Sequence, residues 1–303
     1  MRNKLIVYSA ALSATLFWGA SFVWYKQALL AFDAISIIFF RLVIATILMF
    51  IASKFIYKNE KILKEDIKLF LLLSFFQPLC YFTFESYGMK YVSSTLGALI
   101  IATIPLFTPV FTYFLAREKI TMFNVSGLVV SFVGVIVVLA NDFSTKGSLV
   151  GILLLLLAVV SANLYGIMVK KLLKRYSGFT IVKTQNMIGL LYLTPLFIIF
   201  ERSKLTGLHL SDFIPILELA LFGSTLAFVL KTYVIKKIGL INSNIFANLI
   251  PVYTSIIAYF VLNEILGVQK ILGIVIVISG LVISQIPQLR QMKSTLKKKL
   301  FSI

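Results

Sequence analysis

The sequence is poor in the residues that build disulfide frameworks, metal clusters and charged surfaces. Its 303 residues include one cysteine, Cys80, one histidine, His209, and 11 Asp and Glu against 29 Lys and Arg. A single cysteine excludes an internal disulfide, and these two residues together exclude a metal cluster of the Cys and His type. Only 13% of the residues are charged, against about 25% in ordinary soluble domains. We therefore expect no metal and no cofactor.

Long apolar stretches take up almost the whole chain. The residues are 60% hydrophobic and the mean hydropathy is +1.00. A helix needs about 20 apolar residues to cross a bilayer, and ten stretches meet this length, so we predict an all-α integral membrane protein. The predicted transmembrane spans are residues 5–26, 34–56, 67–89, 95–115, 121–140, 148–169, 178–200, 211–235, 241–262 and 268–286. The first is interpreted as a retained span and not a signal peptide, because nine further spans follow.

Lysine and arginine gather on one set of loops. Basic loops are held on the cytoplasmic side of a membrane. This rule places the N-terminal flank, the loops rich in Lys and Arg and both termini in the cytoplasm, including a basic tail at residues 290–303. The basic residues are spread over loop ends and do not form one basic face, so the net charge of +18 does not indicate nucleic-acid binding. Anionic lipid headgroups in the bilayer are the expected partners.

The chain carries an internal repeat. Residues 104–137 align without a gap on residues 250–283, and nine positions are identical. The identities are Ile104/Ile250, Pro105/Pro251, Thr108/Thr254, Tyr113/Tyr259, Phe114/Phe260, Glu118/Glu264, Gly127/Gly273, Val129/Val275 and Gly134/Gly280. We predict a first repeat at residues 1–143 and a second at 144–289. With five spans in each, the second enters the membrane inverted, which is typical of secondary transporters.

Pro105 and Pro251 occupy matching positions near the middle of spans four and nine. A proline removes a backbone donor and bends a helix, and at membrane depth such a break is tolerated only against protein or a water-filled cavity. Two interpretations remain open: the prolines mark a central cavity and its gating, or they kink the helices for packing. The paired position favours the first. Paired glycines in spans five and ten further predict that these spans pack closely against a neighbour.

Several motifs resemble those of a known family. They are "LFWGASF" (16–22), "FFRLVIA" (39–45), and "IPLFTPVFTYFLAREK" (104–119) repeated as "IPVYTSIIAYFVLNE" (250–264). With the inverted duplication they resemble the EamA family of the drug/metabolite transporter superfamily over essentially the whole chain. The resemblance implies a multi-pass transporter of the inner or plasma membrane, often an exporter of amino acids, related metabolites or amphipathic drugs, with a cavity lined by both repeats.

Polar residues inside the spans are the candidates for that cavity. Gln77, Tyr81 and Glu85 recur every four residues and so share one helix face. Arg41 lies at a similar depth. Arg41 and Glu85 form either a structural ion pair or a site for the two charges of a zwitterionic substrate, and the sequence favours neither.

The remaining candidates are Trp18, Asn163, Asn244 and Asn248. Trp18 lies deep in span one, where its ring suits an apolar or aromatic ligand. Asn244 and Asn248 are four residues apart and lead into Pro251, and their alternative role is hydrogen bonding between helices. Lys231 is expected to extend to the membrane interface.

The sequence favours one of three classes of function. A polytopic membrane enzyme needs a catalytic group of residues, and a receptor or channel needs a long ligand-binding loop or a ring-forming polar helix; neither pattern is present in the sequence. The sequence therefore predicts a secondary transporter of a small organic solute, with no catalytic residue. Proton coupling through Glu85 is a separate hypothesis. The resemblance implies amino acids or related metabolites as the first expected substrates, with amphipathic drugs, nucleobases or sugar derivatives as the alternative. The sequence leaves open whether the transporter is a monomer or a dimer.

Overall fold

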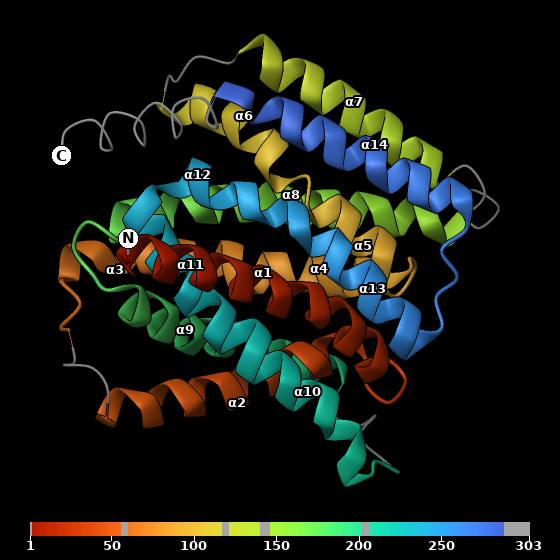
Figure 1. Ribbon diagram of the computed structural model, residues 1–303. Helices are drawn as coiled ribbons and strands as arrows, with labels where there is room; N and C mark the ends of the chain where they lie inside the picture. Colours follow the sequence, from red (N-terminus) through yellow and green to blue (C-terminus); the bar gives the residue numbers. More distant parts are fainter. Residues whose placement is uncertain (1, 56–59, 117–120, 140–145, 202–206, 288–303) are drawn as a thin grey trace, which may run out of the picture.

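The protein is a bundle of helices, shown in Figure 1. The computed structural model describes residues 2–55, 60–116, 121–139, 146–201 and 207–287, and these contain no β-strand. Three features predicted above lie outside the described residues: the boundary between residues 143 and 144, Glu118 and the basic tail 290–303.

The first half of the chain contains five helical units. Two are single helices, α1 (Arg2–Ala28) and α2 (Ala34–Phe55). The third joins a 3₁₀ turn (Lys64–Asp66), α3 (Ile67–Ser74), a π-helical segment (Phe75–Cys80) and α4 (Tyr81–Met89). The fourth is divided into α5 (Ser94–Ile101) and α6 (Ile104–Ala116), and the fifth is α7 (Met122–Leu139).

The second half repeats this order. It begins with α8 (Lys146–Leu172) and α9 (Gly178–Phe200). Its third unit joins a 3₁₀ turn (Leu210–Phe213), α10 (Ile214–Glu218), a π-helical segment (Leu219–Leu226) and α11 (Ala227–Ile238). Its fourth joins α12 (Leu240–Asn244), a 3₁₀ segment (Ile245–Leu249) and α13 (Ile250–Leu262), and α14 (Val268–Ser284) follows.

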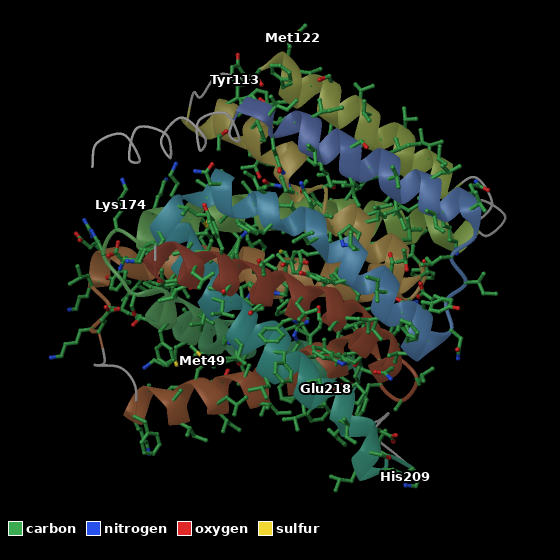
Figure 2. The ribbon with its side chains drawn as sticks, viewed as in Figure 1. Met49, Tyr113, Met122, Lys174, His209 and Glu218 are labelled. Atoms are coloured by element: carbon green, nitrogen blue, oxygen red, sulfur yellow. The ribbon has the colours of Figure 1, made fainter. Side chains whose placement is uncertain are left out.

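Eight helical stretches in the described chain are long and apolar enough to cross a membrane. They coincide with eight of the predicted spans. The remaining two spans correspond to α7 and α14, which are apolar but shorter. Large apolar side chains are exposed on the bundle, among them Phe114 and Phe260. Met122 is another and projects from the outside of the bundle in Figure 2. Such an apolar exterior fits a lipid environment, where polar backbone groups must be satisfied within helices.

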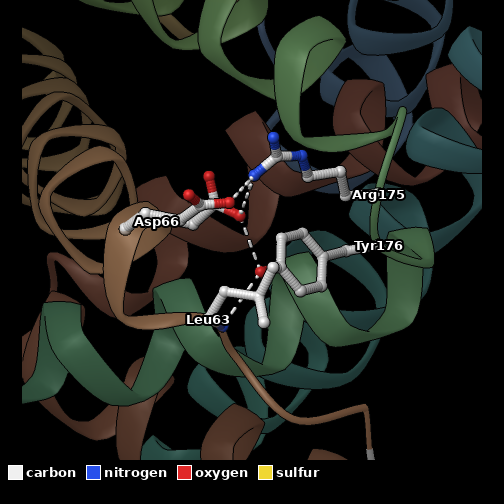
Figure 3. A network of polar contacts seen from close by, with 5 residues as sticks. Leu63, Asp66, Arg175 and Tyr176 are labelled. Atoms are coloured by element: carbon white, nitrogen blue, oxygen red, sulfur yellow. Dashed lines mark hydrogen bonds and ion pairs between the residues drawn. The ribbon is translucent and has the colours of Figure 1, made fainter.

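The two ends of the bundle are defined by its loops. The start of α1 lies at the end of the bundle that also holds Lys174, and we name this the N-terminal end (Figures 1 and 2). His209 lies at the opposite end, which we name the far end (Figure 2). At the N-terminal end, Arg175 pairs with Glu65 and Asp66, and the Tyr176 hydroxyl donates to Asp66 at 2.8 Å (Figure 3). This network ties the start of α3 to the loop after α8.

Helices of each half pack onto the other half. α1 packs on α11 and α13, and in the same way α8 packs on α4, α5 and α6. α2 lies against α9, and each also contacts the π-helical segment of the other half. Because the halves are packed crosswise, the space at the centre of the bundle is bounded by both.

α7 and α14 pack against each other along their paired glycines. The sequence predicted close packing for these two spans but did not identify the neighbour. A Cβ on Gly127 would lie 2.5 Å from the Gly280 carbonyl oxygen, and one on Gly134 would lie 2.9 Å from that of Gly273. Only glycine permits backbones to approach so closely. Asn124 Nδ2 donates to the Ser284 carbonyl at 2.9 Å and adds a polar contact to this interface.

Carboxylates of one half cap helices of the other. Glu264 accepts from the backbone N–H of Ser94 at 2.9 Å and from the Thr95 hydroxyl at 2.8 Å, at the start of α5. Glu201 likewise accepts from Ile35 N–H at 3.1 Å at the start of α2. The first N–H groups of a helix have no partner within it, and a carboxylate there also interacts favourably with the helix dipole. Both caps hold the two halves together at the far end.

A related cap lies at the N-terminal end. Glu60 accepts from the Ser177 backbone N–H at 2.8 Å and from its hydroxyl at 3.0 Å, at the start of α9. Partial burial raises the pKa of Glu60, but hydrogen bonds from Ser177 and Thr180, together with the charge of Lys236, outweigh this effect, and the pKa is lowered overall. The pairing of halves through carboxylates therefore occurs at both ends of the bundle.

Candidate functional site

A cavity of about 900 Å³, its mouth included, lies between the two halves. Its lining residues run from the middle of the bundle to the N-terminal end, where Ile235 and Leu240 contribute. The polar lining residues are Ser21, Arg41, Gln77, Tyr81, Glu85, Thr108, Asn163, Tyr165, Lys231, Thr232 and Asn244. The principal apolar ones are Trp18, Phe22, Phe82, Ile101, Ile104, Phe228 and Ile250. A mostly apolar cavity with a few convergent polar groups is the usual form of a small-molecule site.

Aromatic rings form one wall of the cavity. The Phe228 ring contacts Trp18 edge-on, with centroids 5.3 Å apart, and lies 6.2 Å from both Phe82 and Tyr165. These four rings come from α1, α4, α8 and α11, so both halves supply the wall. Edge-to-face rings at such spacings attract one another and hold their orientations.

Arg41 is held at one end of this wall. Its guanidinium carbon lies 4.0 Å from the centre of the Phe82 ring, and its Nε donates to the Ser224 hydroxyl. Glu85 accepts from the Tyr81 hydroxyl at 2.8 Å. Both charged side chains are buried, and no ion pair joins them, although Glu85 attracts Arg41 across the cavity wall. Of the two interpretations left open by the sequence, the geometry does not support the structural ion pair.

The π-helical segments position this part of the site. Gln77, before Pro78, leaves helical geometry (φ −150°, ψ 119°), and the constant offset between the repeats overlays Phe75–Cys80 on residues 221–226 of the second π-helical segment. Such bulges redirect backbone groups and are frequent at functional sites. Trp18 Nε1 donates to the Gly223 carbonyl at 3.3 Å, and the Ser224 hydroxyl accepts from Arg41 Nε. Gln77 itself lines the cavity.

A chain of polar contacts crosses the end of the cavity nearer the N-terminal end. Lys231 Nζ donates to the Ser243 carbonyl at 3.0 Å and to Asn244 Oδ1 at 2.9 Å. Asn244 Nδ2 donates to the Thr108 hydroxyl at 3.3 Å, which donates to Asn163 Oδ1 at 2.7 Å. Thr108 belongs to the first half and the other members to the second, so the chain bridges the halves.

The predicted prolines lie where the helices break. α5 ends at Ile101 and α6 begins at Ile104, directly before Pro105, and α13 begins at Ile250, directly before Pro251. A proline in the first turn of a helix needs no donor there. Ile104 and Ile250 line the cavity, whereas Pro105 and Pro251 are not among its lining residues. The breaks thus lie at the cavity, and a gating role of the prolines stays a prediction.

Seven of the eight candidate residues line this one cavity: Trp18, Arg41, Gln77, Tyr81, Glu85, Asn163 and Asn244. Asn248 does not. Its amide is paired with Gln285, donating from Nδ2 at 3.1 Å and accepting at Oδ1 from Gln285 Nε2 at 3.3 Å. This is the interhelical hydrogen bonding considered as its alternative role.

The sequence interpretation missed several lining residues. Lys231 was expected to extend to the membrane interface, but it donates to α12 within the bundle, and this expectation is corrected. Thr108 was noted only as a repeat match, and Phe82 and Phe228 were not assigned to the cavity. The aromatic lining residues could have been found from the sequence, because they lie on the same spans as the polar candidates. The described residues contain no group of three or more His, Cys, Asp or Glu side chains able to hold a metal ion.

Comparisons with known proteins agree with this architecture. The model of the EamA-like transporter family matches residues 5–140 and again residues 149–285. An uncharacterized transporter of Archaeoglobus fulgidus is 26% identical over 273 residues, covering 90% of this chain and 96% of its own length. The Bacillus subtilis uncharacterized transporter YcxC is 27% identical over 290 residues, 92% of each chain.

A more distant relative and a solved structure extend the comparison. A WAT1-related, chloroplastic protein of Arabidopsis thaliana is 25% identical over 300 residues, covering 94% of this chain and 71% of its own length. A solved crystal structure matches with a TM-score of 0.69 over 94% of this chain and 98% of its own, at 14% identity, which shows a shared fold alone. The two matches of one family model, in register with the two structural halves, show that the chain belongs to the EamA-like transporter family and is a multi-pass membrane transporter, not an enzyme.

Proposed function

We propose that this protein is a secondary active transporter, in the direction of export, for small amphipathic organic solutes such as amino acids and related metabolites. The cavity between the halves is the observation that carries the proposal, because its wall and its charged side chains come from both repeats. In an alternating-access carrier the substrate site lies where two inverted repeats meet. The protein acts in the cell membrane, inner or plasma.

The proposed topology has ten transmembrane spans, with α7 and α14 as the fifth and tenth. The positive-inside rule supports placing both termini in the cytoplasm. The N-terminal end of the bundle is then cytoplasmic and the far end external. The cavity lining extends toward the N-terminal end, and the Glu264 and Glu201 caps join the halves at the far end. This arrangement supports an inward-facing state, from which a cytoplasmic solute enters.

Each part of the site has a proposed role. Trp18 and Phe228 contact the apolar body of the solute, while Arg41 and Lys231 contact its polar groups from the two ends of the aromatic wall. Gln77, Tyr81, Glu85, Asn163 and Asn244 supply hydrogen bonds. The helix breaks before Pro105 and Pro251 allow the two halves to rock, which opens the site alternately to each side.

Counterflow in proteoliposomes tests the proposal. Vesicles are loaded with a mixture of unlabelled amino acids, each labelled amino acid is added outside in turn, and transient accumulation is measured. Trp18→Ala is compared with Trp24→Ala, because the sequence has two tryptophans and Trp24 does not line the cavity. We expect accumulation that Trp18→Ala loses and Trp24→Ala keeps.

The other outcomes separate substrate from function. If no amino acid accumulates, libraries of drugs, nucleobases and sugar derivatives are tested in the same vesicles. Accumulation of one of these would correct the substrate class and keep the transporter. Failure of every solute, with protein shown to be folded by its melting curve, would contradict the proposed function.

A further inference from the structure

We propose that the cavity selects organic anions, and that Lys231 binds the carboxylate of an amphipathic monocarboxylic acid whose apolar body lies on the aromatic wall. The inference rests on the proposed function and names its substrate class. Three side chains of the cavity lining carry a formal charge. Arg41 and Lys231 are cationic and Glu85 is anionic, which leaves one positive charge in excess. An ionisable group at membrane depth is by default part of a pathway.

The formal charges of Glu85 and Arg41 offset each other. Glu85 attracts Arg41 electrostatically, and both side chains already have neutral hydrogen-bond partners, Tyr81 and Ser224. Lys231 has no such counterpart, since no carboxylate of the described residues forms an ion pair with it. The excess positive charge of the cavity is therefore that of Lys231.

Lys231 also has a donor to spare. A lysine ammonium carries three N–H donors. Two are used by neutral oxygens, the Ser243 carbonyl and Asn244 Oδ1, and the described residues provide no acceptor for the third. Lys231 is partly buried and lines the cavity, so the third donor has room for a ligand there. A carboxylate oxygen would supply both the missing acceptor and the missing negative charge.

The aromatic wall defines the rest of the ligand. Lys231 Nζ lies 5.9 Å from the centre of the Trp18 ring, which packs on Phe228, which in turn faces Phe82. A carboxylate bound to Lys231 would therefore lie directly beside the apolar surface of the aromatic wall. An aromatic or aliphatic body attached to that carboxylate lies along the rings toward Arg41, where apolar contact and ring stacking both stabilise it.

A positively charged ligand fits this end of the cavity poorly. The two oxygens nearest Lys231 already accept from it, and a second cation there would be repelled. Among the described residues, Glu85 alone brings a carboxylate to the cavity lining, and it accepts from the Tyr81 hydroxyl. An amino acid satisfies Lys231 through its carboxylate, but its ammonium then lies close to Lys231, with which no carboxylate of the described residues forms an ion pair. The cavity should therefore favour an acid over its amino-acid analogue, and both over the amine.

Three compounds with the same ring and two-carbon chain test this ranking: 3-phenylpropionate, L-phenylalanine and 2-phenylethylamine. Trp24→Phe leaves Trp18 as the sole tryptophan, so its fluorescence reports occupation of the cavity by each compound in purified, detergent-solubilised protein. We expect 3-phenylpropionate to quench Trp18 at the lowest concentration and 2-phenylethylamine to give no saturable quenching.

Substitutions of Lys231 complete the test. In the same background, Lys231→Gln should lower the affinity for 3-phenylpropionate roughly ten- to hundredfold, as expected for loss of a hydrogen bond to a charged group. Lys231→Arg, which keeps the charge, should restore most of the affinity. The control is Lys183→Gln, which changes a lysine of α9 that does not line the cavity and should leave the affinity unchanged.

Two results would overturn the inference: equal or tighter binding of 2-phenylethylamine, or unchanged 3-phenylpropionate affinity in a folded Lys231→Gln protein. Absence of saturable quenching by all three compounds would overturn it as well. In each case the counterflow experiment shows separately whether the protein still transports some other solute. Failure of anion selectivity is thus distinguished from failure of the transporter proposal.

Discussion

The Thr95 hydroxyl of the first half donates to the Glu264 carboxylate of the second half at 2.8 Å, at the far end of the bundle. Glu264 also accepts from the Ser94 backbone N–H. One carboxylate thus replaces the missing intrahelical partners of α5 and joins the halves at the same time. Opening of the far end must separate these groups.

Glu264→Gln should loosen this contact. The amide keeps one acceptor oxygen but loses the charge that strengthens bonds to the start of α5. We expect hydrogen–deuterium exchange of the Ser94 and Thr95 amides to become faster by several-fold to about tenfold, the effect of losing about 1–1.5 kcal/mol. Glu201→Gln is the matched control, because it should accelerate exchange at Ile35 instead. Unchanged exchange at α5 in Glu264→Gln would contradict the capping role.

Gly280→Ala should destabilise the protein. The added Cβ would lie 2.5 Å from Ser131 N and 2.6 Å from the Gly127 carbonyl, so α7 and α14 must separate. We expect a loss of about 1–3 kcal/mol, as for overpacked interfaces, seen as a lower Tm in detergent. Gly267→Ala has nothing within 4 Å of the new Cβ and should leave Tm unchanged. Equal Tm for the two variants would show that the glycine contact is not needed.

Asn248 should matter for stability and not for transport. Asn248→Ala leaves Gln285 without its partner, which should cost about 1–3 kcal/mol. Replacing both residues, as Asn248→Leu with Gln285→Leu, should recover much of that loss, because no buried amide is then unsatisfied. The melting temperatures of the single and double variants check this. A transport defect in the double variant that exceeds its stability defect would return Asn248 to the list of substrate contacts.

Glu85→Gln tests proton coupling. The Tyr81 hydroxyl can still donate to the amide oxygen, so the local structure should persist. We expect counterflow to continue while transport driven by a pH gradient falls to the level seen without a gradient. Glu218→Gln, in α10 outside the cavity, should keep both activities. Full gradient-driven transport by Glu85→Gln would remove the basis of this hypothesis.

Much of the fold could be predicted from the sequence because membrane spans have a strong apolar signal. The repeat was visible in matched prolines and glycines, and the residues of span three fell on one face because they recur at the helical period. Asn244 and Asn248, four residues apart, would share a face of an α-helix for the same reason. The segment Ile245–Leu249 is a 3₁₀ helix, however. Four residues of 3₁₀ helix turn about 480°, against about 400° in an α-helix, so Asn248 leaves the face of Asn244.

Lys231 was misplaced for a different reason. Counting along span eight put it near the membrane interface, where a lysine extends to water. The turn at Gly239, whose φ is +83°, folds α12 back over the end of α11. This brings the Ser243 carbonyl and Asn244 to the ammonium. Such a tertiary contact has no periodic signature in a single sequence, and neither have the π-helical segments that direct Arg41 toward Ser224.

Cysteine labelling from the two sides of the membrane tests most directly whether the cavity between the halves opens alternately. Ala162 lines the cavity, and the chain's one cysteine is Cys80, so Ala162→Cys in a Cys80→Ala background gives a single reporter. Right-side-out and inside-out vesicles are treated with a membrane-impermeant thiol reagent. The account predicts labelling from both sides, faster from the cytoplasmic side, with external labelling accelerated by Glu264→Gln. Labelling from one side only, unaffected by Glu264→Gln, would contradict it.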